Sequence, residues 1–290
     1  MAHPEDVSVR TVELAGADGL TLVADEAGDP NAATVMLLHG GGQTRHAWGT
    51  TLRVLGSRRH ALSVDLRGHG DSSWAPDGDY TRNAYARDVH ALASVLPSPP
   101  VLVGASLGGI ASLIAIADHP GLARALVLVD VAPRLERGGL QRIGEFMTGH
   151  LDGFASLEEV ADAIHAYNPH RPRPTDLSGL AKILRQRADG RWVWHWDPRF
   201  VSGKFGSPDE TRSTDLARGT QLTDAARSLT IPTLLVRGRM SDLLSEQGAQ
   251  ELLDLVPHAK LADVAGAGHM VAGDRNDLFN DAIIGFLDEL

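Results

Sequence analysis

Hydrophobic and polar positions follow two different periods along the first part of the chain. Residues 7–14 and 20–25 alternate around an Ala-Asp-Gly turn, which predicts an antiparallel hairpin. Residues 34–38 form a continuous apolar run, which is typical of a parallel strand buried on both faces. Residues 81–96 are amphipathic at helical spacing. Further strands are expected at residues 60–66, 100–103 and 125–130, and further helices at residues 46–56 and 109–117.

Strands and helices therefore alternate with short connections, which favours a mostly parallel sheet covered by helices on both faces. After Asp130 the alternation stops, and about a hundred residues precede the next apolar run at residues 232–237. Because one crossover helix needs far fewer residues, we expect residues 133–217 to be an inserted cap with helices near 157–167 and 177–188. The core is then formed by residues 1–132 and 218–290, which end with a helix at 245–256, a strand at 260–264 and a helix at 278–290.

Composition limits the classes of function. The chain has 290 residues, a formal net charge of −10 and no cysteine, so we expect no nucleic-acid partner, no disulfide and no cysteine nucleophile. No apolar run approaches the roughly 20 residues of a membrane span, so we expect no membrane partner. The first residues lack the basic and apolar regions of a signal peptide, which favours the cytoplasm. We expect a monomer or a homodimer.

The most informative motif is Gly-Ala-Ser-Leu-Gly at residues 104–108. An apolar strand precedes it and a helical run follows it, which is the pattern of a nucleophile elbow. Glycine tolerates the tight turn, and the start of a helix favours negative charge. The motif therefore predicts Ser106 as a nucleophile, with the backbone amide of Leu107 as one donor to an oxyanion.

A serine nucleophile needs a base and an acid that orients the base. Asp242 follows the apolar run 232–237 and a glycine, and His269 follows the strand 260–264 and a glycine-rich loop. Their order along the chain, Ser then Asp then His, is the one that this type of fold uses. We therefore predict that His269 pairs with Asp242 and faces Ser106.

Five motifs in this order resemble the alpha/beta hydrolases, in particular the capped esterase, lactonase and epoxide-hydrolase-like group. The motifs are His39-Gly-Gly-Gly, Asp65-Leu-Arg-Gly-His-Gly-Asp-Ser, Gly104-Ala-Ser-Leu-Gly-Gly, Gly238 to Asp242, and Gly266-Ala-Gly-His. The resemblance implies an α/β-hydrolase fold with an eight-stranded sheet and a helical cap after the sixth strand. It also implies Ser106 as nucleophile, His269 as general base and then acid, and Asp242 as orienting acid. Some members take the acid from the position of Asp130, which is kept as the alternative.

The same resemblance assigns the second oxyanion donor to the amide of Gly41, with Gly42 as the neighbouring candidate at the substrate. His39 and His69 are interpreted as structural. Because the histidines lack metal-binding spacing, we expect no metal and no cofactor. The cap tryptophans line an apolar substrate pocket in one interpretation and form the core of the cap in the other; they are Trp192, Trp194 and Trp196.

A serine at the elbow argues against epoxide hydrolases and dehalogenases of this group, which the resemblance associates with an aspartate there. We predict hydrolysis of a small, mostly apolar carboxylic ester or lactone through an acyl-enzyme. Carbon–carbon bond hydrolases and cofactor-free perhydrolases share the triad and are alternatives, although Gln43 and Ala105 depart from the carbon–carbon pattern. A non-catalytic binding module is a further alternative, whose signature would be the loss of a triad residue.

Overall fold

Eight strands form one twisted sheet in the computed structural model, which describes residues 6–169, 172–202, 219–269 and 276–290. The order across the sheet is β1-β2-β4-β3-β5-β6-β9-β10. Strand β2 is antiparallel to β1 and β4, and all other neighbours are parallel. The strands are β1 (Val9–Ala15), β2 (Thr21–Ala27), β3 (Thr34–Leu38), β4 (His60–Val64), β5 (Val101–Ala105), β6 (Ala125–Val129), β9 (Thr233–Gly238) and β10 (Lys260–Val264). The predicted hairpin and mostly parallel sheet are confirmed.

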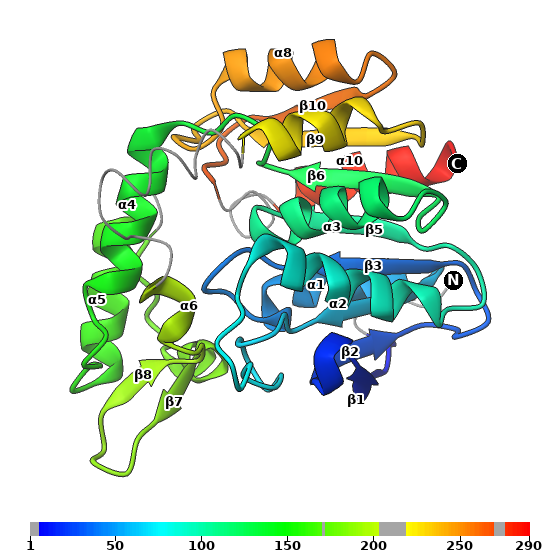
Figure 1. Ribbon diagram of the computed structural model, residues 1–290. Helices are drawn as coiled ribbons and strands as arrows, with labels where there is room; N and C mark the ends of the chain where they lie inside the picture. The colour runs from blue at the N-terminus through cyan, green and yellow to red at the C-terminus, as the bar shows by residue number, and fades with distance from the viewer. Residues whose placement is uncertain (1–5, 170–171, 203–218, 270–275) are drawn as a thin grey trace.

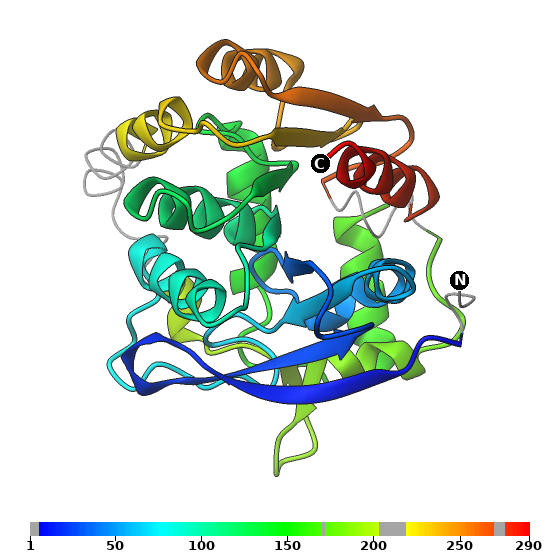
Figure 2. The same cartoon turned by 90° about the vertical axis from the view of Figure 1, so that its right-hand side faces the viewer.

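The sheet lies between two layers of helices, as Figure 2 shows. Alternate residues of β3 pack into two separate hydrophobic cores. Val35 and Leu37 lie on one face of the sheet, and Met36 and Leu38 lie on the other. This two-sided burial explains why the sequence of β3 is apolar without alternation. One face carries α1 (Gly49–Gly56) and α10 (Asn276–Asp288), and the other carries α2 (Arg82–Ser94), α3 (Leu107–Asp118) and α8 (Glu246–Leu255).

The segment between β6 and β9 stands beside the sheet edge at which β3 and β6 end (Figure 1). Residues 170–171 and 203–217 of the predicted cap lie outside the described residues. The described elements are α4 (Arg137–Thr148), α5 (Leu157–Tyr167), the 3₁₀ helix η4 (Ser178–Ile183), β7 (Leu184–Gln186), β8 (Trp192–Trp194) and α6 (Arg199–Ser202).

The helix expected over residues 177–188 is wrong. A short 3₁₀ helix ends at Ile183, and β7 then pairs antiparallel with β8, placing Leu184 opposite Trp194. The turn between them is closed by a hydrogen bond from Arg187 N to Arg191 O (2.9 Å), with Gly190 at φ 82°. The apolar spacing of residues 177–188 fits a helix locally, but cross-strand pairing decides the conformation.

Backbone hydrogen bonds join residues 195–197 of this segment to the loop that follows β4. Gly70 N donates to His195 O (2.7 Å), and Asp197 N donates to Gly68 O (2.8 Å). The Tyr80 hydroxyl donates to the buried Asp197 carboxylate (2.5 Å). Burial and this carboxylate raise the pKa of Tyr80 well above its ordinary value, so the phenol remains a donor. These contacts join the inserted segment to the loop that follows β4.

Candidate active site

Ser106 occupies a strained turn between β5 and α3. Its φ is 44° and its ψ is −107°, a backbone conformation that non-glycine residues rarely adopt. The turn is possible because its glycines pass close to other backbone atoms. A Cβ on Gly108 would lie 2.4 Å from Leu38 O, and a Cβ on Gly104 would lie 2.4 Å from Gly109 N. The elbow predicted from the sequence is therefore present, with Ser106 at its tip.

His269 pairs with Asp130, so the predicted pairing with Asp242 is wrong. His269 Nδ1 lies 2.7 Å from Asp130 Oδ2, and the side chain of Asp130 is fully buried. Asp242 is 39% exposed and forms an ion pair with Arg142 of α4 at 2.9 Å. The physical reason is that β6 and β9 are neighbouring parallel strands. Their ends meet at the same sheet edge, so the loop after either strand can supply an acid.

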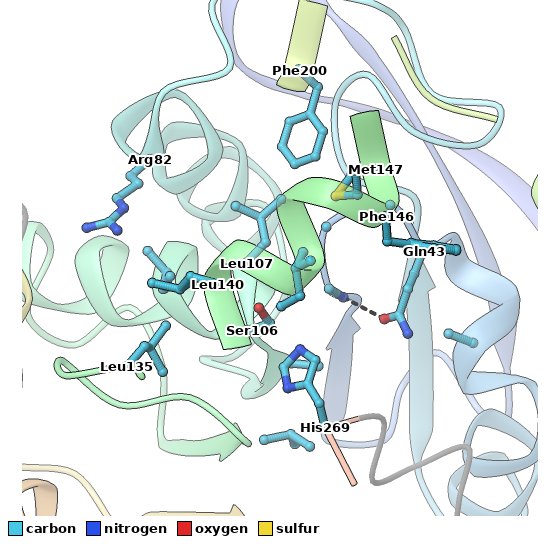
Figure 3. A pocket seen from close by; sticks show the side chains of 18 of the residues that line it. Gln43, Arg82, Ser106, Leu107, Leu135, Leu140, Phe146, Met147, Phe200 and His269 are labelled. Atoms are coloured by element: carbon cyan, nitrogen blue, oxygen red, sulfur yellow. Dashed lines mark hydrogen bonds between the residues drawn. The ribbon is translucent and has the colours of Figure 1, made fainter. Parts of the chain in front are cut away.

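The loop after β3 contains three glycines, and the backbone amides of two of them already have acceptors. Gly40 N donates to Gln43 Oε1 (2.9 Å), the contact drawn in Figure 3, and Gly42 N donates to His69 Nε2 (3.1 Å). Within the described part of the chain, the Gly41 amide has no acceptor. Leu107 is the first residue of α3, so its amide has no acceptor within the helix. Gly41 and Leu107 therefore have the free donors that an oxyanion needs, whereas the Gly42 amide is occupied.

His39 and His69 both act as supports. The His39 ring is fully buried, donates from Nδ1 to Gly40 O (2.7 Å) and accepts from Leu66 N at Nε2 (3.0 Å). Burial lowers the pKa of His39, which matches a neutral ring with one donor and one acceptor nitrogen. His69 holds Gly42 through Nε2, and its Nδ1 lies 3.0 Å from Arg67 O. The structural interpretation of both histidines agrees with these contacts.

Ser106 and His269 both line a cavity of about 2430 Å³ between the core and the inserted segment. Figure 3 shows the His269 ring next to Ser106, with apolar side chains of the inserted segment around them. The labelled apolar lining residues are Leu107, Leu135, Leu140, Phe146, Met147 and Phe200. The cavity therefore combines a polar floor with a mostly apolar wall.

The three cap tryptophans divide between the two interpretations. Trp194 and Trp196 line the cavity and stack on each other with ring centroids 5.1 Å apart. Trp196 also lies close to Gly42, because a Cβ placed there would be 3.4 Å from its ring. Trp192 is not among the described lining residues, and its backbone pairs with Phe154. Only Trp194 and Trp196 are thus placed to contact a ligand.

Two residues near the site have roles that the sequence did not predict. Gln43 accepts the Gly40 amide, and Ser241 donates its hydroxyl to Asp130 Oδ2 (2.5 Å). Gln43 directly follows the His39-Gly-Gly-Gly motif and Ser241 lies within the Gly238 to Asp242 motif, but neither motif assigns these residues a role. Among the described residues, no group of three or more His, Asp or Glu side chains is arranged to hold a metal ion. None of the described helices is long and apolar enough to cross a membrane.

Comparison with known proteins identifies the family. The sequence model of the alpha/beta hydrolase family matches residues 35–282. An esterase of Mycobacterium tuberculosis is 32% identical over 270 residues, covering 89% of this chain and 84% of that protein. The chain therefore belongs to the alpha/beta hydrolase family, as the resemblance implied.

Solved structures of relatives have the same fold. A structure of the Mycobacterium tuberculosis esterase matches with a TM-score of 0.76 at 31% identity, covering 97% of this chain and 92% of that one. A crystal structure of an E-2-(acetamidomethylene)succinate hydrolase matches with a TM-score of 0.83 at 25% identity, covering 97% and 100%. The 2-(acetamidomethylene)succinate hydrolase of Mesorhizobium japonicum is 29% identical over 237 residues, covering 81% of this chain and 80% of that protein. These comparisons support a hydrolase of the esterase-containing family.

Proposed function

We propose that the protein is a serine hydrolase that cleaves a carboxylic ester or lactone through a Ser106–His269–Asp130 triad. The observation that carries the proposal is the 2.7 Å contact between His269 Nδ1 and the buried Asp130 carboxylate, in one cavity with Ser106 at a strained elbow. A carboxylate can only accept at this contact, so His269 Nδ1 carries the hydrogen. Nε2 then has a free lone pair and can act as a base.

Acylation begins when Ser106 Oγ attacks the ester carbonyl carbon while His269 Nε2 takes the hydroxyl proton. The carbonyl electron pair moves onto oxygen, and the amides of Gly41 and Leu107 stabilise that oxyanion. When the oxyanion collapses, the bond to the alcohol oxygen breaks. The departing alcohol takes the proton from His269 Nε2, which leaves an acyl group on Ser106. In a lactone the alcohol remains attached to the acyl group.

Deacylation repeats these steps with water. His269 Nε2 takes a proton from water, whose oxygen attacks the acyl carbon and forms a second oxyanion. Collapse of this oxyanion releases the carboxylic acid, and the proton returns from Nε2 to Ser106 Oγ. The described residues within 133–202 act as a cap in this scheme, because several of their side chains line the cavity and limit its exposure to water.

The lining of the cavity favours a substrate with an apolar acyl or alcohol group, since leucine, phenylalanine and methionine side chains surround Ser106. The volume of about 2430 Å³ exceeds the roughly 300–1000 Å³ that is typical of small-molecule sites. The substrate is therefore not restricted to the small esters that the sequence favours.

The proposal is tested by covalent labelling. A fluorophosphonate is expected to inactivate the enzyme with one adduct per chain, located at Ser106 by peptide mass spectrometry. The same enzyme is expected to release the acid from p-nitrophenyl esters or simple lactones. Labelling of another residue, or labelling of Ser106 without hydrolysis of either substrate class, would contradict the proposal and favour a binding module.

Substitution of Trp196 by alanine is expected to change the preference among p-nitrophenyl esters of different acyl length by about tenfold in relative kcat/KM. The reason is that its ring lines the cavity beside Gly42, and each methylene that gains or loses an apolar contact changes discrimination by roughly tenfold or more. Trp192→Ala, in β8 and close to Trp196 along the chain, is the matched control. It is expected to lower thermal stability while the relative rates stay within about twofold. Unchanged relative rates in Trp196→Ala, with lower thermal stability, would assign Trp196 to the core of the cap as well.

A further inference from the structure

The loop after β9 was expected to supply the acid of the triad, and it supplies a hydroxyl to that acid instead. Ser241 precedes Asp242 in this loop, and Ser241 N donates to Gly238 O (3.0 Å) to close a turn. Within this turn the Ser241 side chain is directed at Asp130, while Asp242 pairs with Arg142 on the outside.

The hydrogen of the Ser241 hydroxyl has one available direction. Ser241 Oγ accepts the backbone amides of Leu243 (3.1 Å) and Leu244 (3.3 Å), which uses both lone pairs of a hydroxyl oxygen. Its single hydrogen therefore goes to Asp130 Oδ2, 2.5 Å away. This is the same carboxylate oxygen that contacts His269 Nδ1.

The Asp130 carboxylate is thus held from two sides. Oδ2 accepts from Ser241 and His269, and Oδ1 accepts from Gly238 N (3.2 Å). Asp130 itself lies at φ 49°, a conformation that costs a non-glycine residue free energy and that its surroundings must maintain. A buried carboxylate also needs all of these donors, because water does not reach it.

We propose that Ser241 is a positioning residue of the triad, whose hydroxyl fixes the orientation of the Asp130 carboxylate toward His269. This inference rests on the proposed serine hydrolase function. Ser241 is not among the described residues that line the cavity, so it acts through Asp130 and not on the substrate.

Charged groups around this loop have other partners. The Arg237 guanidinium donates to Leu244 O (3.0 Å) and contacts Asp263 (3.0 Å), and Arg142 pairs with Asp242. Glu136, directly before α4, accepts the Ser245 hydroxyl (2.6 Å) and donates its amide to Leu243 O (2.9 Å). The cap therefore holds the loop that carries Ser241, while the direct donors to the carboxylate are Ser241, Gly238 and His269.

The test compares variants at position 241 that keep or lose the hydroxyl group. Ser241→Thr keeps a hydroxyl, Ser241→Val replaces that hydroxyl by a methyl group, and Ser241→Ala removes it without adding volume. We expect Ser241→Ala and Ser241→Val to lower kcat about tenfold with KM unchanged within about twofold, because hydrogen bonds to charged groups have effects of at least this size. Ser241→Thr is expected to retain most of the activity. If the threonine and valine variants do not fold, the kcat of Ser241→Ala alone tests the inference.

A double-substitution cycle separates positioning from the support that Ser241 gives to its own turn. In an Asp130→Asn background, Ser241→Ala is expected to have no further effect on kcat, whereas a purely structural role would lower kcat by the same factor in both backgrounds. The low-field proton resonance of His269 Nδ1–H gives a readout that needs no substrate. It is expected to move in Ser241→Ala and to remain in place in Asp242→Asn.

Unchanged kcat and an unchanged resonance in Ser241→Ala would overturn the inference, as would equal losses in both backgrounds. Failure of the proposed function gives a different result. In that case the unsubstituted enzyme hydrolyses neither ester nor lactone, whereas the resonance still reports whether Ser241 acts on the His269–Asp130 pair.

Discussion

Replacement of Ser106 by alanine is expected to lower kcat for ester hydrolysis by about 10⁶-fold, the size of loss measured when a serine protease loses its nucleophile. No acyl-enzyme can form without Oγ, and only the oxyanion donors and substrate binding then assist the attack of water. The rate is measured with a p-nitrophenyl ester on highly purified protein, because traces of unsubstituted enzyme would dominate the residual activity.

The fold is expected to survive this substitution. Alanine must adopt the same φ of 44°, so the backbone strain of the elbow stays, and only a hydroxyl at the floor of the cavity is removed. Thermal unfolding should therefore remain close to that of the original protein. A folded Ser106→Ala variant that keeps a tenth or more of the activity would show that the nucleophile lies elsewhere.

Substitution of Asp130 by asparagine is expected to lower kcat/KM by about 10⁴-fold, while Asp242→Asn changes it by no more than about twofold. Asparagine at position 130 can donate as well as accept, so it no longer fixes the hydrogen on His269 Nδ1. Asp242 is 39% exposed, and its ion pair with Arg142 lies at the surface, where such pairs contribute little.

The two aspartate variants are measured side by side with the same ester, and thermal unfolding is followed for both. The pair of variants is informative because either loop was a plausible source of the acid from the sequence alone. A large loss in Asp242→Asn with activity retained in Asp130→Asn would reverse the assignment.

The fold was predictable because it depends on local periodicity. The apolar run at β3, the amphipathic pattern of α2 and the elbow around Ser106 each identify themselves within a short window. The order of these elements along the chain then restricts the topology to very few arrangements.

The acid was not predictable because the choice depends on the geometry of a turn. The register of the ladder pairs Val129 with Val236, so Asp130 lies directly beyond one strand end. The turn closed between Gly238 and Ser241 then directs Ser241 inward and leaves Asp242 outside. A shift of one residue in that turn would exchange these two side chains, and periodicity carries no information about it.

The oxyanion donor in the loop after β3 was also not predictable from the residues alone. Three consecutive glycines are equivalent in the sequence, and the structure distinguishes them by their acceptors. Gln43 lies next to the loop, but His69 follows it by more than twenty residues. Choosing Gly41 therefore required the family resemblance, since the contact with His69 is set by the packing of the loop after β4.

The backbone pairing of residues 195–197 with the loop after β4 bears on how substrates and products exchange with solvent. Gly68 and Gly70 form backbone hydrogen bonds with residues 195–197 of the inserted segment. Gly70 O also accepts from the Arg185 guanidinium (2.8 Å). The Asp197 carboxylate, buried against Tyr80, cannot leave this contact without losing its hydroxyl donor. On the opposite side, the start of α4 is joined to the loop after β9 by the amide of Glu136, which donates to Leu243 O (2.9 Å), as well as by the exposed Arg142–Asp242 ion pair. Because backbone hydrogen bonds hold the inserted segment on both sides, we expect substrates and products to exchange with solvent without either contact being broken.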